Sequence, residues 1–200
     1  MSRTVGSHGP TTYEAIRQVG LRLIFEHGYE AMSLRQLAQE VGIQAGSLYN
    51  HIPNKQTLLF DLMRHHHAEV LEACQAALRD FVEPASQMRA FVAFHVSHHI
   101  DRQQEVYVGN SELRSLEPAN REVITDLRQA YEQEVIGIIE RGIAQRVFSV
   151  ADARVAAYGI LAMLTGVCTW FRPNGTRSAE EVITIYSDMV INSIALPSAL

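Results

Sequence analysis

Small and polar side chains gather between residues 33 and 55 at a spacing that suits contact with a nucleic acid. Two short segments with apolar residues at helical spacing flank Gly42, which can supply the left-handed turn between closely packed helices. Ser33 is a good N-cap for the first segment, and Gln36 three residues later can complete a capping box. Two short helices joined by a tight glycine turn are typical of a helix-turn-helix.

The second of these segments carries side chains that can read bases. In a helix-turn-helix the first helix packs across the DNA backbone and the second enters the major groove. Glutamine and asparagine can hydrogen-bond adenine through two atoms at once, and small residues allow close approach to the base edges. The small core would come from Leu34, Leu37, Ile43, Leu48 and Ile52. The outer face would carry Gln44, Ala45, Ser47, Tyr49 and Asn50.

Histidines form a second group whose types and spacing could do chemistry. Six of the nine histidines lie in two runs, at residues 65–67 and 95–99. His95 and His99, at i and i+4, share a helical face and could bind a transition metal, as could His65 with Glu69. Val96 stands where a zincin-type hydrolase needs glutamate. We therefore expect no catalytic residue, no metal and no cofactor. A metal-responsive regulator and a helical metal-dependent enzyme remain the alternatives.

Composition places the chain among globular proteins. Of 200 residues, 47% are hydrophobic and 20% are charged, which excludes a disordered or collagen-like chain. The net charge is −5, but residues 1–55 carry five basic and four acidic residues, so only this first quarter has a positive balance. If one part of the chain contacts a polyanion, it is this part.

Cysteine use and the apolar segments favour a cytoplasmic protein. Cys74 and Cys168 are far apart in the sequence, so we expect reduced thiols. The first residues have no apolar segment of the kind found in a signal peptide. Residues 155–171 carry no charge, but the run is shorter than a membrane span and contains glycine and threonine. We expect a helix buried in a core or a subunit interface, and no membrane.

Helical periodicity extends along nearly the whole chain, so the fold class is predicted to be all-α with about nine helices. The predicted arrangement is a flexible arm at 1–10, a helix-turn-helix DNA-binding domain at 11–55 with three helices, and a helical ligand-binding and dimerisation domain at 56–200. Beyond a first helix that contains Ile16 and Ile24, the expected ranges are 33–42, 45–51, 55–81, 86–102, 105–115, 120–146, 152–171 and 178–195.

Residues 21–59, reading LRLIFEHGYEAMSLRQLAQEVGIQAGSLYNHIPNKQTLL, resemble the DNA-binding domain of TetR-type (TetR/AcrR family) transcriptional regulators. The matching positions are the turn at 27–29, Ser33-Leu34, Gly42, the run 46–49 and Asn54-Lys55. The resemblance implies a repressor that binds a palindromic double-stranded DNA operator, and no enzyme activity. Tyr49, His51 and Lys55 would contact phosphates. The full set of implied DNA-binding residues is Thr12, Ser33, Gln44, Ala45, Gly46, Ser47, Tyr49, Asn50, His51 and Lys55.

The remainder resembles the regulatory region of the same family. Residues 110–117, and residues 170–175 with 178–181, are similar to segments of repressors of fatty-acid, branched-chain and steroid catabolism, many of which respond to acyl-CoA thioesters. The resemblance implies a small-molecule effector, and a homodimer formed through the helices near 152–171 and 178–195. Candidate ligand-binding residues are Phe91, Phe94, His95, His98, Arg114, Met163, Val167 and Trp170. The alternative is that these are core residues and solvated charges. A helical adaptor that binds no DNA would leave the pattern from Gly46 to Lys55 unexplained.

Overall fold

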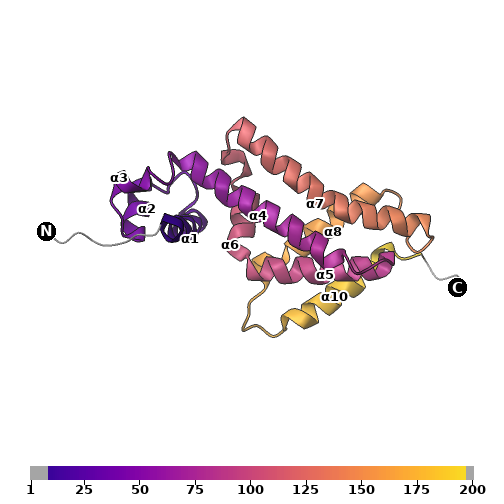
Figure 1. Ribbon diagram of the computed structural model, residues 1–200. Coiled ribbons are helices and arrows are strands. Elements are labelled where there is room, and N and C mark those ends of the chain that lie inside the picture. The colour runs from indigo at the N-terminus through magenta and orange to yellow at the C-terminus, as the bar shows by residue number, and fades with distance from the viewer. Residues whose placement is uncertain (1–8, 197–200) are drawn as a thin grey trace. The chain divides into compact units, whose positions relative to one another are not determined.

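The computed structural model describes residues 9–196, which fold into helices joined by short turns (Figure 1). The first elements are α1 (Gly9–His27), α2 (Leu34–Val41), α3 (Ala45–Leu48), α4 (Lys55–Leu78), α5 (Pro84–Asp101) and α6 (Gln103–Ser111). A 3-10 turn, η1 (Leu113–Ser115), precedes α7 (Pro118–Ala144), α8 (Ala153–Thr165), α9 (Val167–Trp170) and α10 (Ala179–Ile194). Residues 9–196 contain no strand, and their one isolated bridge joins Phe148 to Ala195.

The all-α prediction is confirmed, and each expected range overlaps a helix. The helices expected at 45–51 and 55–81 end three residues early, at Leu48 and Leu78. Two further differences change the path of the chain. The helix expected at 152–171 is interrupted at Gly166, which separates α8 from the four-residue α9. The helix expected at 105–115 ends at Ser111, and the chain then turns through η1 before Pro118 begins α7. The predicted arm at 1–10 lies largely outside the described residues.

The chain divides into two compact units. The first combines Met1–His66 with Gln104–Ile124, and the second combines His67–Gln103 with Thr125–Leu200. The first unit is therefore built from two separate stretches of sequence, and α4 contributes residues to both units. The functional boundary predicted after residue 55 is not tested by this division and stays a prediction.

The first unit folds around the apolar faces of α1, α2 and the start of α4. Ile16, Leu23, Leu37, Leu48 and Leu58 are fully buried there. Figure 1 shows α1, α2 and α3 gathered together at the beginning of the chain. Burying such a side chain contributes about 1.5–3 kcal/mol, so this small core can hold even the four-residue α3 in place.

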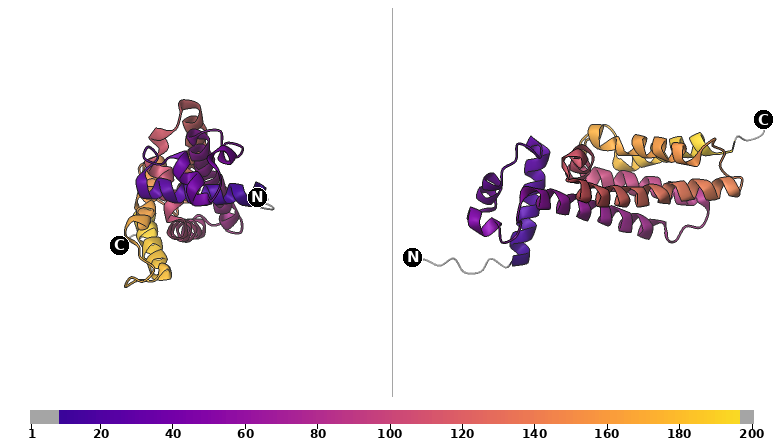
Figure 2. Two further views of the ribbon diagram at one scale, coloured as in Figure 1. Left: turned by 90° about the vertical axis from the view of Figure 1, so that its left-hand side faces the viewer. Right: turned by 90° about the horizontal axis from the view of Figure 1, so that it is seen from above.

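The second unit is a bundle in which α5 packs against α8, α9 and α10 (Figure 2). Its core includes Phe91, Val135, Leu164 and Val190, all fully buried. Asp152 caps α8 by accepting from the backbone N–H groups of residues 154 and 155. Both cysteines are free thiols.

Helices α8 and α10 keep apolar side chains on the surface of the second unit. On α8, Val155 is 67% exposed and Tyr158 is 46% exposed. On α10, Ile185 is 46% exposed and Met189 is 48% exposed. Other apolar residues of this region, Ile160, Leu164, Val167, Val182 and Val190, are buried within the unit itself. The four exposed residues, Val155, Tyr158, Ile185 and Met189, are called the apolar strip below.

One stretch among the described residues, Ala153–Trp170, is long and apolar enough to cross a membrane by length and composition alone. Its helix is interrupted at Gly166, and α5 packs against both of its parts. A single such stretch is weak support for a membrane span, because the apolar helix of a protein interface passes the same test.

Replacing Gly142 with alanine should destabilise the protein. A Cβ atom at Gly142 would overlap the buried ring of Phe148, whereas a Cβ at Gly137 in the same helix would meet only the mobile end of Arg141. We expect Gly142→Ala to lower the free energy of unfolding by about 1–3 kcal/mol. The matched change Gly137→Ala should be neutral or stabilising, by up to about 1 kcal/mol. Urea denaturation measures both, and equal effects would contradict this packing.

Candidate functional site

Helix α2 is delimited by the residues that the sequence singled out. Ser33 has extended backbone, and its Oγ accepts a hydrogen bond from the Gln36 N–H at 3.1 Å. Gly42 ends the helix in the left-handed conformation, with φ of 78°, which glycine adopts without the steric cost that a Cβ brings. The capping box is half formed, because the Gln36 side chain donates to Glu40. The tight turn between α2 and α3 is thus set by local sequence.

Helix α3 is anchored by one face and open on the other. Leu48 and the following Ile52 are fully buried. Tyr49 is 55% exposed, and Ser47 and His51 are half-buried. The remaining predicted base-reading residues, all exposed, are Gln44, Ala45, Gly46 and Asn50. The structure therefore leaves most of the expected recognition residues accessible on or beside α3, and their contacts with bases stay predictions.

Three other predicted DNA-binding residues lie in different surroundings. Ser33 is exposed at the start of α2. Thr12, on α1, is only 9% exposed. Lys55 is half-buried and its ammonium group faces backbone carbonyls. Their contacts with DNA stay predictions.

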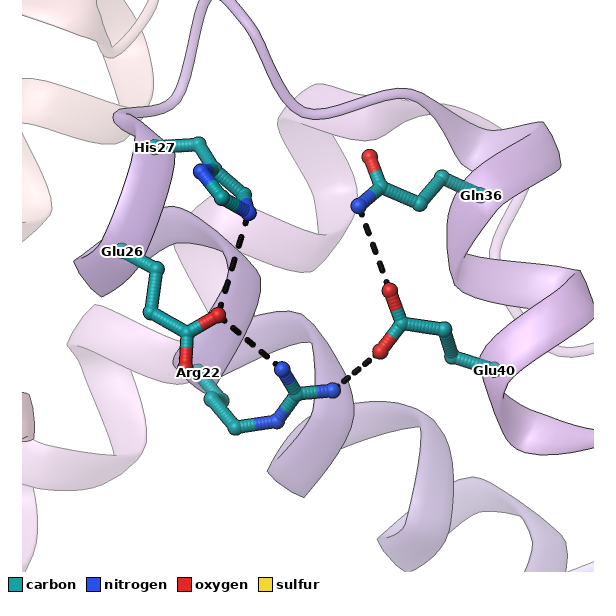
Figure 3. Close-up of polar contacts among 5 residues, drawn as sticks. All are labelled: Arg22, Glu26, His27, Gln36 and Glu40. Carbon is teal, nitrogen blue, oxygen red and sulfur yellow. Dashed lines mark hydrogen bonds and ion pairs between the residues drawn. The ribbon is translucent and has the colours of Figure 1, made fainter.

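An ion-pair cluster joins the end of α1 to α2 (Figure 3). The Arg22 guanidinium donates to Glu26 at 3.0 Å and also to Glu40, and Gln36 donates to the other oxygen of Glu40. His27 lies 3.7 Å from Glu26. The hydrogen bond from Arg22 lowers the pKa of Glu40. Because these groups are exposed, the cluster links α1 to α2 through Arg22 and Glu40 but contributes little to stability.

Sequence reasoning missed several polar residues that hold the turn between α1 and α2. The Tyr29 N–H donates to Glu112 Oε1 at 3.1 Å, and the Gln56 amide donates to the Tyr29 hydroxyl at 2.9 Å. Glu112 lies in residues 110–117, which the resemblance had assigned to the regulatory region, yet it belongs to the first unit. Helical periodicity carries no signal for such long-range polar pairs.

The histidine run on α5 is buried in the second unit and does not form a chelating pair. The His95 ring contacts the Tyr131 hydroxyl at 2.9 Å through Nδ1 and the Thr165 hydroxyl at 3.1 Å through Nε2. The rings of His95 and His99 are stacked, with centroids 3.7 Å apart and an interplanar angle of 13°. Imidazole binds a metal in its ring plane, so parallel rings cannot direct nitrogens at one ion. Among residues 9–196, no group of three or more His, Cys, Asp or Glu side chains could hold a metal.

Comparison with known proteins decides the family. Residues 82–194 match a family described as the tetracyclin repressor-like, C-terminal domain, and residues 16–62 match one described as bacterial regulatory proteins, tetR family. The chain belongs to the TetR family. It is therefore a DNA-binding transcriptional regulator with a helix-turn-helix and a helical regulatory region, not an enzyme.

Relatives of this TetR-family chain cover almost its whole length. The HTH-type transcriptional repressor KstR2 of Rhodococcus jostii is 21% identical over 97% of this chain and 95% of its own. The solved structure of the TetR family regulator PfmR from Thermus thermophilus is 30% identical over 92% of this chain and 99% of its own, with a TM-score of 0.81. AibR in complex with isovaleryl coenzyme A and operator DNA has a TM-score of 0.81 at 24% identity, covering 94% of this chain and all of that one.

The predicted ligand residues of this TetR-family protein belong to both units and differ in burial. Phe91, His95 and Val167 are buried in the core of the second unit, with Phe94 and Met163 packed against that core. His98, half-buried, lies beside Phe94. Arg114 is exposed and belongs to the first unit. Trp170 is 48% exposed and packs edge-on against Tyr186 of α10.

Acid should destabilise the regulatory region of this TetR-family protein. Burial lowers the pKa of His99 to about 3 and that of His67 to about 4, and the pKa of His95 falls well below its usual value for the same reason. The unfolded histidines take up protons near pH 6.5, so the unfolded state binds more protons between about pH 6.5 and 4. The stability that the neutral rings contribute is therefore complete above pH 6.5 and is lost as pH falls.

We expect the free energy of unfolding to decrease from pH 7.5 to pH 5, by up to about 1.4 kcal/mol per pH unit for each such histidine. Urea denaturation at several pH values measures this slope. His99→Leu should flatten it, because one proton fewer is taken up on unfolding. Parallel profiles for the wild type and His99→Leu would contradict a neutral, buried His99.

Proposed function

We propose that this regulator is a repressor that binds a palindromic operator as a homodimer and is released by a small-molecule effector. The observation that carries the proposal is the surface at the two ends of α3, where Gln44, Tyr49 and Asn50 are exposed while Leu48 is buried and anchors the helix. The proposed location is the cytoplasm, where a regulator of this kind meets its DNA and where free thiols persist.

The apolar strip supports pairing with a second copy of the chain. Val155 and Tyr158 on α8, with Ile185 and Met189 on α10, leave apolar surface in water that another copy would cover. A two-fold dimer carries two recognition helices, which bind half-sites about 34–36 Å apart on a palindrome. These are the helices for which the sequence predicted dimerisation.

The effector is proposed to be an acyl-CoA or a similar lipid-like metabolite. AibR has been crystallised with isovaleryl coenzyme A, and another relative of this chain is named the fatty acid metabolism regulator protein of Bacillus subtilis. In the second unit of this chain, the ring of Phe91 lies against the ring of His95, with centroids 5.5 Å apart. The effector class is proposed from these relatives.

Selection of bound fragments from genomic DNA tests the operator proposal. The purified protein would be incubated with fragments at about 100 mM salt, which keeps phosphate contacts strong, and the bound DNA sequenced. Selective enrichment of a palindromic sequence over all other fragments would support the operator proposal. Failure of the wild type to enrich any sequence, with and without acyl-CoA thioesters present, would overturn it.

Truncating the base-reading amides should relax operator specificity. We expect Gln44→Ala and Asn50→Ala each to weaken operator binding by about 5–150-fold per half-site if the amide bonds a base through two atoms, because each such contact contributes about 1–3 kcal/mol. The dimer loses one contact in each half-site, so the two losses multiply. Binding to unrelated DNA should be unchanged. Gln133→Ala, an exposed amide in the second unit, is the matched control. Equal loss on operator and random DNA would mean that these residues do not read bases.

Acyl-CoA thioesters should bind the protein and weaken its hold on the operator. Isothermal titration with a panel that includes isovaleryl-CoA measures binding, and free coenzyme A is the control for the acyl group. A coupling of about 1–3 kcal/mol would change operator affinity by roughly 5–150-fold. If no thioester binds, the proposed effector class is wrong, while the DNA-binding proposal is judged by the fragment selection.

A further inference from the structure

The single lysine of the sequence, Lys55, directs its ammonium group at the protein backbone. Its Nζ lies 2.8 Å from the carbonyl oxygen of Tyr29, 3.2 Å from that of Glu30 and 3.3 Å from that of Met32. It also sits 4.3 Å from the centre of the Tyr29 ring. An ammonium has three N–H donors, so each donor already has an acceptor. In this arrangement Lys55 has none left for a DNA phosphate.

The three carbonyls belong to the turn between α1 and α2. Residues 28–33 leave α1 at Gly28 and enter α2 at the Ser33 cap. The direction of this turn sets how α2 leaves α1, and α2 packs directly against α3. A group that holds the turn therefore also sets the direction of the recognition helix.

Gln56, the next residue of α4, forms hydrogen bonds through both the nitrogen and the oxygen of its side-chain amide in the same region. Its Nε2 donates to the Tyr29 hydroxyl at 2.9 Å and to the Ser115 carbonyl at 2.6 Å, and its Oε1 accepts from the Glu117 N–H at 3.1 Å. The Tyr29 ring is therefore held by Lys55 on its face and by Gln56 at its hydroxyl. Burial raises the pKa of Tyr29, so the hydroxyl keeps its proton.

Glu112 ties the same turn to η1. Its Oε1 accepts from the Tyr29 N–H at 3.1 Å, and its Oε2 accepts from the Ser115 hydroxyl at 2.6 Å. All of these residues lie within the first unit. The set is called the Tyr29 junction and consists of Tyr29, Lys55, Gln56, Glu112, Ser115 and Glu117.

We propose that Lys55 and Gln56 are positioning residues, which act on DNA binding by holding the α1–α2 turn through the Tyr29 junction and not by contacting DNA. The proposal rests on the proposed function, since positioning has meaning only if α3 reads an operator. It differs from the phosphate contact that the family resemblance implies for Lys55. Moving the ammonium to a phosphate would strip three carbonyls of their donor.

Lys55→Arg separates the two roles. Arginine keeps the charge and binds phosphate as well as lysine or better, so a phosphate contact would survive the change. The N–H donors of the planar guanidinium are spread over three nitrogens. Arginine therefore cannot replace a single ammonium nitrogen that donates to three carbonyls around it. We expect operator affinity to fall about tenfold or more, in line with the loss of bonds to a charged group. Wild-type affinity in Lys55→Arg would overturn the proposal.

The salt dependence of operator affinity in Lys55→Met is a second, independent test of the role of Lys55. Each phosphate contact adds about 0.9 to the slope of log affinity against log salt, so a dimer that loses two contacts would show a fall of about 1.8. Positioning predicts weaker binding with the slope of the control. Arg79→Met, an exposed charge loss in the second unit, is the matched control for net charge. A slope reduced by about 1.8 relative to Arg79→Met would assign Lys55 to the phosphate.

Hydrogen exchange tests the junction without DNA. In the full-length protein, Lys55→Arg and Gln56→Leu should speed amide exchange in residues 28–33 and leave α5 and α8 of the second unit unchanged. Gln18→Leu, which removes only an exposed bond to Glu14, is the control. Unchanged exchange in the turn would overturn the proposal. If the variants exchange faster but the wild type binds no DNA, Lys55 and Gln56 do hold the turn. The proposed repressor function would then be wrong.

Discussion

A helix of four residues cannot hold its own shape in water, and this constraint governs the DNA-binding unit. Isolated helices shorter than about 12–15 residues are marginal even in favourable sequences. The residues that flank α3, Gln44, Tyr49 and Asn50, are exposed. Leu48 and the adjacent Ile52 supply the fully buried apolar side chains here. Its stability and direction are therefore supplied by the turns and helices around it, which are held partly by local caps and partly by long-range hydrogen bonds.

Some of that chemistry can be read from sequence because it is local. The Ser33 cap and the left-handed Gly42 act within a few residues of their own positions, so the bounds of α2 follow from them. The helices longer than two turns follow from apolar periodicity. Pro84 and Pro118 begin α5 and α7, since proline fits the first turn of a helix and no later one.

What the sequence does not predict depends on pairs far apart along the chain. Gln56 meets Ser115 and Glu117 across about 60 residues, and Tyr29 meets Glu112 across 83. A polar pair of this kind has no period and no preferred spacing. The inner and outer faces of α8 raise a related problem, because apolar residues occur all round that helix. Only packing shows that Ile160 lies inside while Val155 lies outside.

The histidines of α5 show how a polar group can be buried without a partner of opposite charge. A neutral imidazole has one donor nitrogen and one acceptor nitrogen. His95 therefore accepts from one of the two hydroxyls it contacts and donates to the other, Tyr131 on one side and Thr165 on the other. Both of its ring nitrogens are thus satisfied inside an apolar core. The same arrangement fixes the ring, which in turn supports the stacked ring of His99.

The discontinuous first unit has a consequence for building hybrid regulators. The simplest exchange of the DNA-reading part of one protein for that of another is a cut at a single point in the chain. Here a transplant of residues up to His66 alone would leave behind Gln104–Ile124, which completes the same unit. Tyr29 and Gln56 would arrive in the new host without Glu112 and Ser115. A working graft must carry both segments, or a host whose own residues supply the missing acceptors.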